Sequence, residues 1–75
     1  MNIKFSRHAK RRLKLYRIDP EDITNHVKSS FQNKNVIIAN DPYILQKYKY
    51  PLKIVLAKEE NNIIIVTAYP LKKGK

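Results

Sequence analysis

The sequence lacks cysteine and tryptophan, and its single glycine is Gly74, close to the end of its 75 residues. Without cysteine, no disulfide can stabilise the chain and no Cys/His zinc cluster can replace one. Without glycine elsewhere there is no glycine-rich phosphate loop, so nucleotide hydrolysis is not expected. A chain this short buries only about 60 to 65 per cent of its unfolded surface. Its core must be thin, and its stability comes from packing or partly from a partner.

Long apolar runs and acidic clusters are also missing. The longest aliphatic run is residues 63–66, whereas a membrane-spanning helix needs about 20 apolar residues. No apolar stretch of signal-peptide type follows the basic N-terminus. Because the six acidic residues are scattered, no carboxylate cluster is available for magnesium, and we expect neither metal nor cofactor. These absences, with the lack of cysteine, predict a cytoplasmic protein that is not associated with a membrane.

Positive charge is what the sequence has in excess. Sixteen Lys and Arg against six Asp and Glu give a net charge of +10, and seven of the first eighteen residues are basic while none is acidic. At this size such a charge favours a polyanionic partner. Nucleic acid is the first expectation, an acidic protein the second and a membrane surface the third. The simplest alternative, that the charge serves solubility alone, does not explain its clustering.

Two N-terminal helices are predicted. Ser6 suits an N-cap, and the first helix is expected to end at Tyr16 or Arg17 because Asp19 and Pro20 follow. Its apolar stripe repeats at spacings of four, four and three, through Phe5, Ala9, Leu13 and Tyr16. Asp19 is expected to cap the second helix, which should end between residues 32 and 35. The buried face of the second helix is expected to consist of Ile23, Val27 and Phe31.

The remaining chain predicts strands at residues 36–39, 43–50, 53–58 and 62–69, with a hairpin connection at 59–61. Residues 1–5 either pair as an edge strand or lead directly into the first helix. The unalternating run at 63–66 is typical of a central strand that is covered on both faces. The fold class is therefore α+β, with the two helices on one face of a three- to four-stranded antiparallel sheet. We expect residues 1–75 to form a single domain.

His8 is the leading candidate for chemistry. It lies one helical turn from Arg12, with Arg11 close to both, so an imidazole and two guanidinium groups can converge on one phosphate. In the absence of metal ligands this arrangement favours metal-independent ribonuclease chemistry, which needs a proton acceptor, a proton donor and cations around the phosphorus. The position of His8 near a basic helix N-terminus favours a neutral imidazole and a role as base, although bound phosphate would favour the acid role.

Other residues have two interpretations each. His8 is either catalytic or a surface residue that touches phosphate, and His26 is expected to be a structural or surface residue. Tyrosines and lysines of residues 43–50 either stack bases and hold phosphates or pack a thin core. Thr67 and Tyr69 share a face of the last strand and either line a cleft or cap the core. The residues expected to bind phosphate or RNA are Lys10, Arg11, Lys14, Arg17, Lys47, Tyr48, Lys49 and Tyr50.

The segments His8–Arg12, residues 18–23 and residues 66–70 resemble a family of small, mostly uncharacterised bacterial and archaeal domains. That family has an H-A-x-x-R helix, then R-G-I-x-x-x-x-[IV], and closes with a V-x-T-x-Y-P strand. Tyr16 and Arg17 stand here where the family has an arginine and a glycine. The resemblance implies the architecture of the RelE and colicin-type ribonuclease toxins, an acidic antitoxin as partner and metal-free RNA cleavage. It assigns the catalytic site to His8, Arg12, Thr67 and Tyr69.

Three functions follow as expectations. The first is a toxin-like, metal-independent endoribonuclease that cuts mRNA or tRNA within a toxin–antitoxin pair. The second is a non-catalytic RNA- or DNA-binding module that uses the same basic face. The third is an interaction subunit whose positive charge matches an acidic partner.

Overall fold

The computed structural model describes residues 2–29 and 35–72, and these form three helices and a four-stranded sheet. The elements are β1 (Asn2–Phe5), α1 (Arg7–Tyr16), α2 (Pro20–Ser29), β2 (Val36–Ala39), α3 (Pro42–Tyr48), β3 (Leu52–Glu59) and β4 (Asn62–Pro70). The α+β class agrees with the sequence prediction. The third helix was not predicted, and no helix in the described part of the chain is long and apolar enough to span a membrane.

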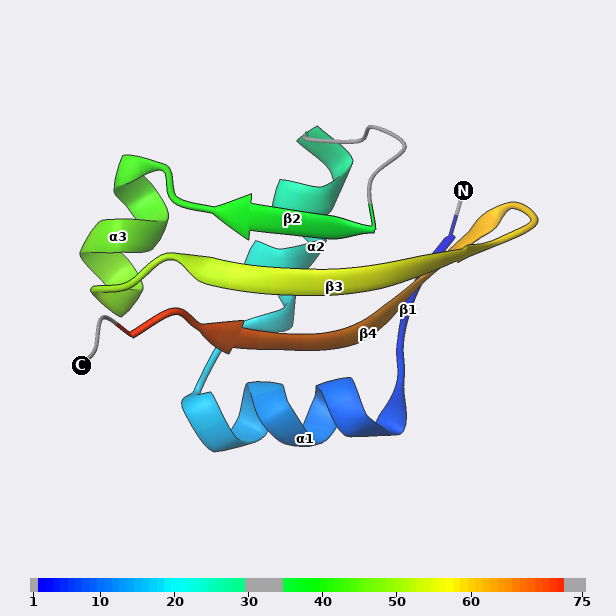
Figure 1. The fold of residues 1–75 in the computed structure, drawn as a ribbon, viewed down its shortest axis with the longest axis horizontal. Helices are drawn as coiled ribbons and strands as arrows, with labels where there is room; N and C mark the ends of the chain where they lie inside the picture. Colours follow the sequence, from blue (N-terminus) through cyan, green and yellow to red (C-terminus); the bar gives the residue numbers. More distant parts are fainter. Residues whose placement is uncertain (1, 30–34, 73–75) are drawn as a thin grey trace.

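The sheet has the strand order β1-β4-β3-β2 and is mixed (Figure 1). β3 is antiparallel to both β2 and β4, as expected, but β1 pairs with β4 in parallel, with Phe5 opposite Ile65. The expectation of a purely antiparallel sheet was therefore wrong. Of the two alternatives for residues 1–5, the structure has the edge strand. A register shift between Val55 and Leu56 leaves Val66 of β4 without a Cα partner, which is a β-bulge.

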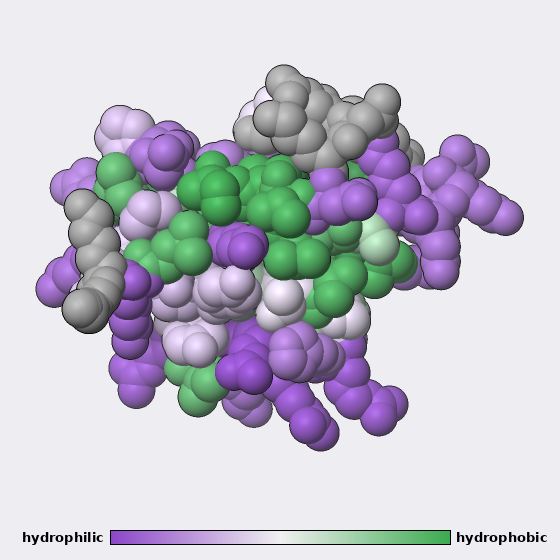
Figure 2. All heavy atoms as spheres, viewed as in Figure 1, coloured by the Kyte–Doolittle hydropathy of each residue, from purple (hydrophilic) through white to green (hydrophobic). Residues whose placement is uncertain are grey.

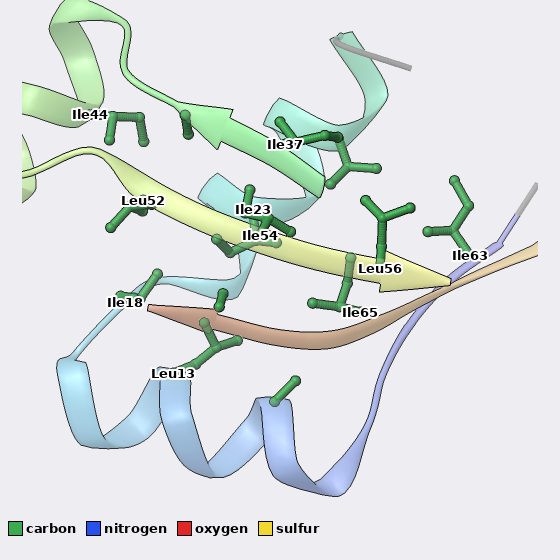
Figure 3. Packing of buried hydrophobic residues seen from close by; sticks show 14 residues of the cluster. Leu13, Ile18, Ile23, Ile37, Ile44, Leu52, Ile54, Leu56, Ile63 and Ile65 are labelled. Carbon is green, nitrogen blue, oxygen red and sulfur yellow. The ribbon is translucent and has the colours of Figure 1, made fainter. Parts of the chain in front are cut away.

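One face of the sheet carries the core. α2 lies behind the sheet in Figure 1 and contributes Ile23 and Val27, which are each 1 % exposed. Figure 3 shows the fourteen residues of this cluster, including Leu13 of α1, Ile54 of β3 and Ile65 of β4. The ordered packing of these aliphatic side chains is the main source of stability in so small a domain.

The opposite face of the sheet is left uncovered by the three helices (Figure 1). β4 is a central strand, as expected, but its expected burial on both faces was wrong, because Val66 is 38 % exposed. Val36 and Ile38 of β2 are also exposed on this side, each at 41 %. Figure 2 shows this hydrophobic surface over β2 and β3, with hydrophilic side chains below it along α1. We call this side of the sheet the open face.

α1 continues the path of β1 and lies alongside the second half of β4 rather than over the face of the sheet (Figure 1). The Ser6 hydroxyl accepts a hydrogen bond from the Ala9 N–H at 3.0 Å and donates one to the Val66 carbonyl at 2.8 Å. Ser6 is thus the N-cap, as predicted, and it also fixes the start of the helix against the bulge of β4. Ala9 and Leu13 are buried toward the core.

α3 occupies residues for which the sequence predicted a strand at 43–50, and that prediction was wrong. Asp41 caps α3 by accepting the Ile44 N–H at 3.1 Å, and Pro42 occupies the first turn. Ile44, which is 2 % exposed, enters the core. Asp19 accepts the Glu21 N–H at 2.9 Å at the start of α2, as predicted. Phe31 and most of the segment 32–35, where the second helix was expected to end, lie outside the described residues.

Candidate functional site

The two flanks of α1 face different sides of the molecule. Successive helical residues are rotated by about 100°, so His8 and Arg12 lie to one side of the buried Ala9–Leu13 line and Lys10 and Lys14 to the other. Lys10 and Lys14 line a pocket with Pro20, the first residue of α2, which lies behind the sheet. His8 and Arg12 therefore lie on the side of the open face.

His8 and Arg12 contact each other on this flank. The Arg12 Nε–H donates to His8 Nε2 across 3.4 Å, which is a long hydrogen bond. His8 is exposed and Arg12 is half-buried. In this contact His8 Nε2 is the acceptor and the Arg12 guanidinium is the donor. An imidazole nitrogen next to a permanent cation is suitably placed to take a proton from a ligand whose phosphate the cation binds.

Thr67 and Tyr69 project from β4 on the open face. They flank Ala68, which is 0 % exposed and points into the core, so strand alternation places both on the opposite side. Both are half-buried. Tyr69 pairs across the sheet with Lys53, whose Nζ lies 5.9 Å from the centre of the tyrosine ring. The sequence analysis missed Lys53, because only the β3–β4 register shows that it neighbours Tyr69.

The residues of α1 and β4 are matched in height. Ser6 is anchored at Val66, and from there the helix rises about 3 Å to His8 and about 9 Å to Arg12 at ~1.5 Å per residue. β4 rises about 3 Å to Thr67 and about 10 Å to Tyr69 at ~3.3 Å per residue. With parallel axes, these ideal rises would place His8 level with Thr67 and Arg12 level with Tyr69. We call the surface formed by His8, Arg12, Lys53, Thr67 and Tyr69 the α1/β4 face.

Other predicted phosphate-binding residues of α1 are dispersed around the helix. Lys10 and Lys14 lie on the far flank, and Arg11 is exposed at the side of the helix away from the core. Arg17 follows the last turn with a left-handed backbone, φ 57°. The structure therefore brings one guanidinium group, that of Arg12, into contact with His8. The expected approach of the second, from Arg11, is not present as a contact.

The predicted RNA-binding residues of 43–50 divide into two sets. Lys47 and Tyr48 turn inward toward Asp22 of α2, which is 8 % exposed. The Asp22 carboxylate accepts Lys47 Nζ at 2.8 Å, the Tyr48 hydroxyl at 2.5 Å and the Tyr43 hydroxyl at 3.0 Å. We call these four residues the Asp22 cluster. The other set, Lys49 and Tyr50, is exposed in the turn after α3.

The Asp22 cluster changes the protonation equilibria of its members. Burial alone would raise the pKa of Asp22, but the hydrogen bonds from Lys47, Tyr48 and Tyr43 and the charge of Lys47 lower it below 3.8. The hydrogen bond to Asp22 raises the pKa of Lys47 above 10.5. Burial, followed by the hydrogen bond to Asp22, raises the pKa of Tyr48 above 10.0. The positive charge of Lys47 is thus neutralised by the buried Asp22 carboxylate, although the Lys47 side chain itself is 40 % exposed.

Among residues 2–29 and 35–72, no group of three His, Cys, Asp or Glu side chains is placed to hold a metal ion. His26 lines a pocket of about 260 Å³ between α2 and α3 with Asp22 and Asp41. It is half-buried and lies away from the α1/β4 face. The chemistry that the α1/β4 face can perform is therefore that of an imidazole, a guanidinium, an amine and two hydroxyls.

Fold and site together define a class: a small α+β domain in which a basic helix flanks a mixed sheet with one open face. The chain belongs to the DUF4258 family, described as a domain of unknown function, whose sequence profile matches residues 5–70. No curated protein and no solved structure matches the chain significantly. The resemblance to a small uncharacterised domain family thus agrees with the comparison, while the relationship to RelE and colicin-type ribonucleases stays a prediction.

Proposed function

We propose that this domain is a metal-independent endoribonuclease that binds RNA across the α1/β4 face. The observation that carries the proposal is the contact between the exposed His8 and the half-buried Arg12, in which His8 Nε2 is the acceptor. The net charge of +10 supplies the long-range attraction for a polyanion. The same face also carries a further cation, Lys53, and the hydroxyl groups of Thr67 and Tyr69.

Phosphate binding and imidazole activation are coupled in this geometry. A phosphate that approaches the pair offers Arg12 a charge-assisted, bidentate partner, which is stronger than its 3.4 Å bond to a neutral imidazole. Arg12 then turns to the phosphate, and the lone pair of His8 Nε2 becomes available. The base is therefore released when the substrate is in place.

The proposed reaction is attack by the neighbouring ribose hydroxyl. His8 Nε2 takes the proton of the 2′-hydroxyl while the 2′-oxygen forms a bond to phosphorus. The bond from phosphorus to the 5′-oxygen breaks, and the 5′-oxygen takes a proton from the Tyr69 hydroxyl. The products are a 2′,3′-cyclic phosphate and a 5′-hydroxyl, and proton exchange with water restores both side chains. Arg12 and Lys53 stabilise the added negative charge, with a hydrogen bond from Thr67.

The test is cleavage of a 5′-labelled RNA in the presence of a chelator. The protein is expected to produce 2′,3′-cyclic phosphate ends, and His8→Ala is expected to lose activity by about 100- to 10,000-fold because the proton acceptor is removed. Thermal unfolding checks that the fold is kept, as expected for an exposed side chain. RNA in which the nucleotides carry 2′-O-methyl groups should be resistant, since it has no attacking hydroxyl.

Arg12→Ala and Arg7→Ala form a matched pair for the same assay. Both remove one arginine from α1, but Arg7 is rotated by about 100° around the helix from His8, and it is Arg12 whose side chain hydrogen-bonds His8. Loss of activity in Arg12→Ala with retention in Arg7→Ala is expected. Full activity of His8→Ala, or equal losses in the two arginine variants, would reject the assignment of the site.

The second candidate is a non-catalytic RNA-binding module. The observation that favours it is the openness of the sheet, where Tyr69 and Lys53 lie side by side and can stack a base and hold a phosphate. This candidate requires binding that weakens steeply as salt rises, with RNA that stays intact after long incubation. The cleavage assay with chelator distinguishes the two.

The proposal includes a toxin–antitoxin arrangement in the cytoplasm, with an acidic antitoxin as the protein partner. Its support is the positive charge of α1 beside the exposed apolar residues Val36, Ile38 and Val66 of the open face. Such a surface can be covered by an acidic segment with an apolar side. Growth arrest on expression of wild type but not of His8→Ala is the cellular expectation.

A further inference from the structure

A second hollow, away from the α1/β4 face, lies where α1, α3 and β4 end. It has a volume of about 280 Å³, and the buried residues Ile18 and Leu52 contribute to its lining. Its lining also includes three tyrosines, Tyr16, Tyr48 and Tyr50, together with Leu15 and Pro70. The cations Arg17 and Lys72 complete the lining, and both are exposed. We call this hollow the tyrosine pocket.

The shape of the tyrosine pocket is fixed by the ends of two helices. The Tyr48 hydroxyl donates to Asp22 and accepts the Asp19 N–H at 3.0 Å, so this ring has little freedom. Lys49 then adopts a left-handed backbone with φ 71°, which turns the chain so that Tyr48 and Tyr50 line the same pocket. Arg17 adopts φ 57° at the end of α1. Both residues are the C-caps of their helices, so the ends of α1 and α3 set the walls of the pocket.

The chemistry of the lining selects a base rather than a phosphate. Aromatic rings and aliphatic side chains bind the flat, weakly polar surface of a nucleobase by stacking. The C-terminal ends of α1 and α3 carry partial negative charge, which disfavours a phosphate inside the pocket. Arg17 and Lys72 can hold the phosphates on either side of the base.

The pocket is within reach of the proposed cleavage site. Arg12 and Tyr16 are four residues apart on α1, which corresponds to about 6 Å along the helix axis. That is close to the separation of neighbouring nucleotides in a single strand. We infer that the tyrosine pocket receives one nucleobase of the single-stranded RNA whose phosphate lies at His8 and Arg12. This inference rests on the proposed RNA binding at the α1/β4 face.

The test measures binding of labelled, 2′-O-methylated RNA hexamers, which the proposed reaction cannot cleave. One hexamer carries all its bases, and the other has the same backbone without bases. Tyr50→Ala is expected to weaken binding of the first hexamer by about 5- to 100-fold, the value of one stacked base, and to leave binding of the second unchanged. Tyr50 is 36 % exposed, so its truncation should leave the core intact.

Tyr50→Trp is the matched control, since it keeps an aromatic ring. The chain contains no other tryptophan, so its fluorescence reports on the pocket alone. Wild-type affinity and quenching by the base-containing hexamer, without quenching by the abasic one, are expected. This measurement decides the question even if Tyr50→Ala does not fold.

The outcomes separate the two proposals. Equal binding by wild type and Tyr50→Ala, or equal losses for both hexamers, overturns the tyrosine pocket while RNA binding at the α1/β4 face stands. Quenching of Tyr50→Trp by both hexamers also overturns it. Failure of the wild-type protein to bind either hexamer at low salt overturns the pocket and the proposed function together.

Discussion

Two groups of tyrosine and lysine in this molecule have similar geometry and opposite surroundings. In the Asp22 cluster, Lys47 Nζ lies 5.5 Å from the ring centres of both Tyr43 and Tyr48. In the α1/β4 face, Lys53 Nζ lies 5.9 Å from the ring centre of Tyr69. The first group surrounds a carboxylate that is 8 % exposed, whereas no ion pair is recorded for Lys53 among the described residues.

The difference between these groups is where their charge is compensated. Asp22 accepts hydrogen bonds from all three members of its group, so their polar atoms are satisfied within the fold. The ion pairs among the described residues do not include Lys53, so its amine can take a ligand phosphate as its counter-charge. A lysine beside tyrosines is therefore available to an external phosphate only when no internal carboxylate forms an ion pair with its amine.

The largest expected effect is on the Asp22 cluster. Asp22→Ala removes the common acceptor of two tyrosine hydroxyls and an amine, and leaves the half-buried Tyr48 hydroxyl without its shortest hydrogen bond. We expect the free energy of unfolding to fall by about 2–3 kcal/mol. Chemical denaturation measures this loss. Binding of the abasic hexamer, which depends on the α1/β4 face and not on the tyrosine pocket, should be unchanged at a temperature where the variant is folded.

Acid titration provides the control for this effect. Because the pKa of Asp22 is lower in the folded protein than in the unfolded chain, its stabilisation is complete above the unfolded pKa of about 4. The stabilisation is lost as pH falls through the folded pKa. Asp22→Asn should lack this component, so wild type and variant should converge in stability as the pH is lowered. A constant difference down to the lowest pH would contradict the role of the charge.

Much of the local structure could be predicted because its causes are close in the sequence. Ser6 and Asp19 cap the first two helices as expected, and the His8–Arg12 contact follows from a spacing of four residues. α3 was missed although Asp41-Pro42 repeats the Asp19-Pro20 pattern that starts α2. The tyrosine-rich composition of residues 43–50 favoured a strand, and the buried Asp22 that holds the helix is distant in sequence.

The parts that could not be predicted depend on register. The parallel pairing of β1 with β4 and the bulge at Val66 follow from packing between distant segments. The β3–β4 register places Lys53 beside Tyr69, and the Ser6–Val66 hydrogen bond fixes the start of α1 at the bulge. The open face could not be predicted for the same reason. The apolar run at 63–66 indicated burial on both sides of the sheet, but the bulge and the position of α1 at the edge of the sheet leave Val66 exposed. The functional roles of these residues stay predictions.

The next largest expected effect distinguishes Lys53 of the α1/β4 face from Lys47 of the Asp22 cluster. Lys53→Ala is expected to weaken RNA binding and to reduce the slope of log K against log salt by about 1, the value for one phosphate contact. Lys47→Ala removes the same charge but is expected to leave both quantities unchanged and to lower the thermal stability instead, since its charge serves Asp22. Fluorescence anisotropy at several salt concentrations measures both. Equal slopes in the two variants would remove the distinction between the groups.

The smallest expected effect concerns Arg17, where the resembling family has glycine. Arg17 ends α1 with φ 57° and ψ 43°, while the Ile18 N–H bonds the Leu13 carbonyl at 2.8 Å. A side chain with a Cβ atom is disfavoured in this conformation, so Arg17→Gly should raise the free energy of unfolding by about 0.5–1 kcal/mol. Arg17→Ala keeps the Cβ and removes the charge, and it should not stabilise. Both variants should bind RNA more weakly than wild type if the guanidinium serves the tyrosine pocket. If the alanine variant as well as the glycine variant were more stable than wild type, the destabilising effect of Arg17 would come from repulsion among the cations of α1 and not from its backbone conformation.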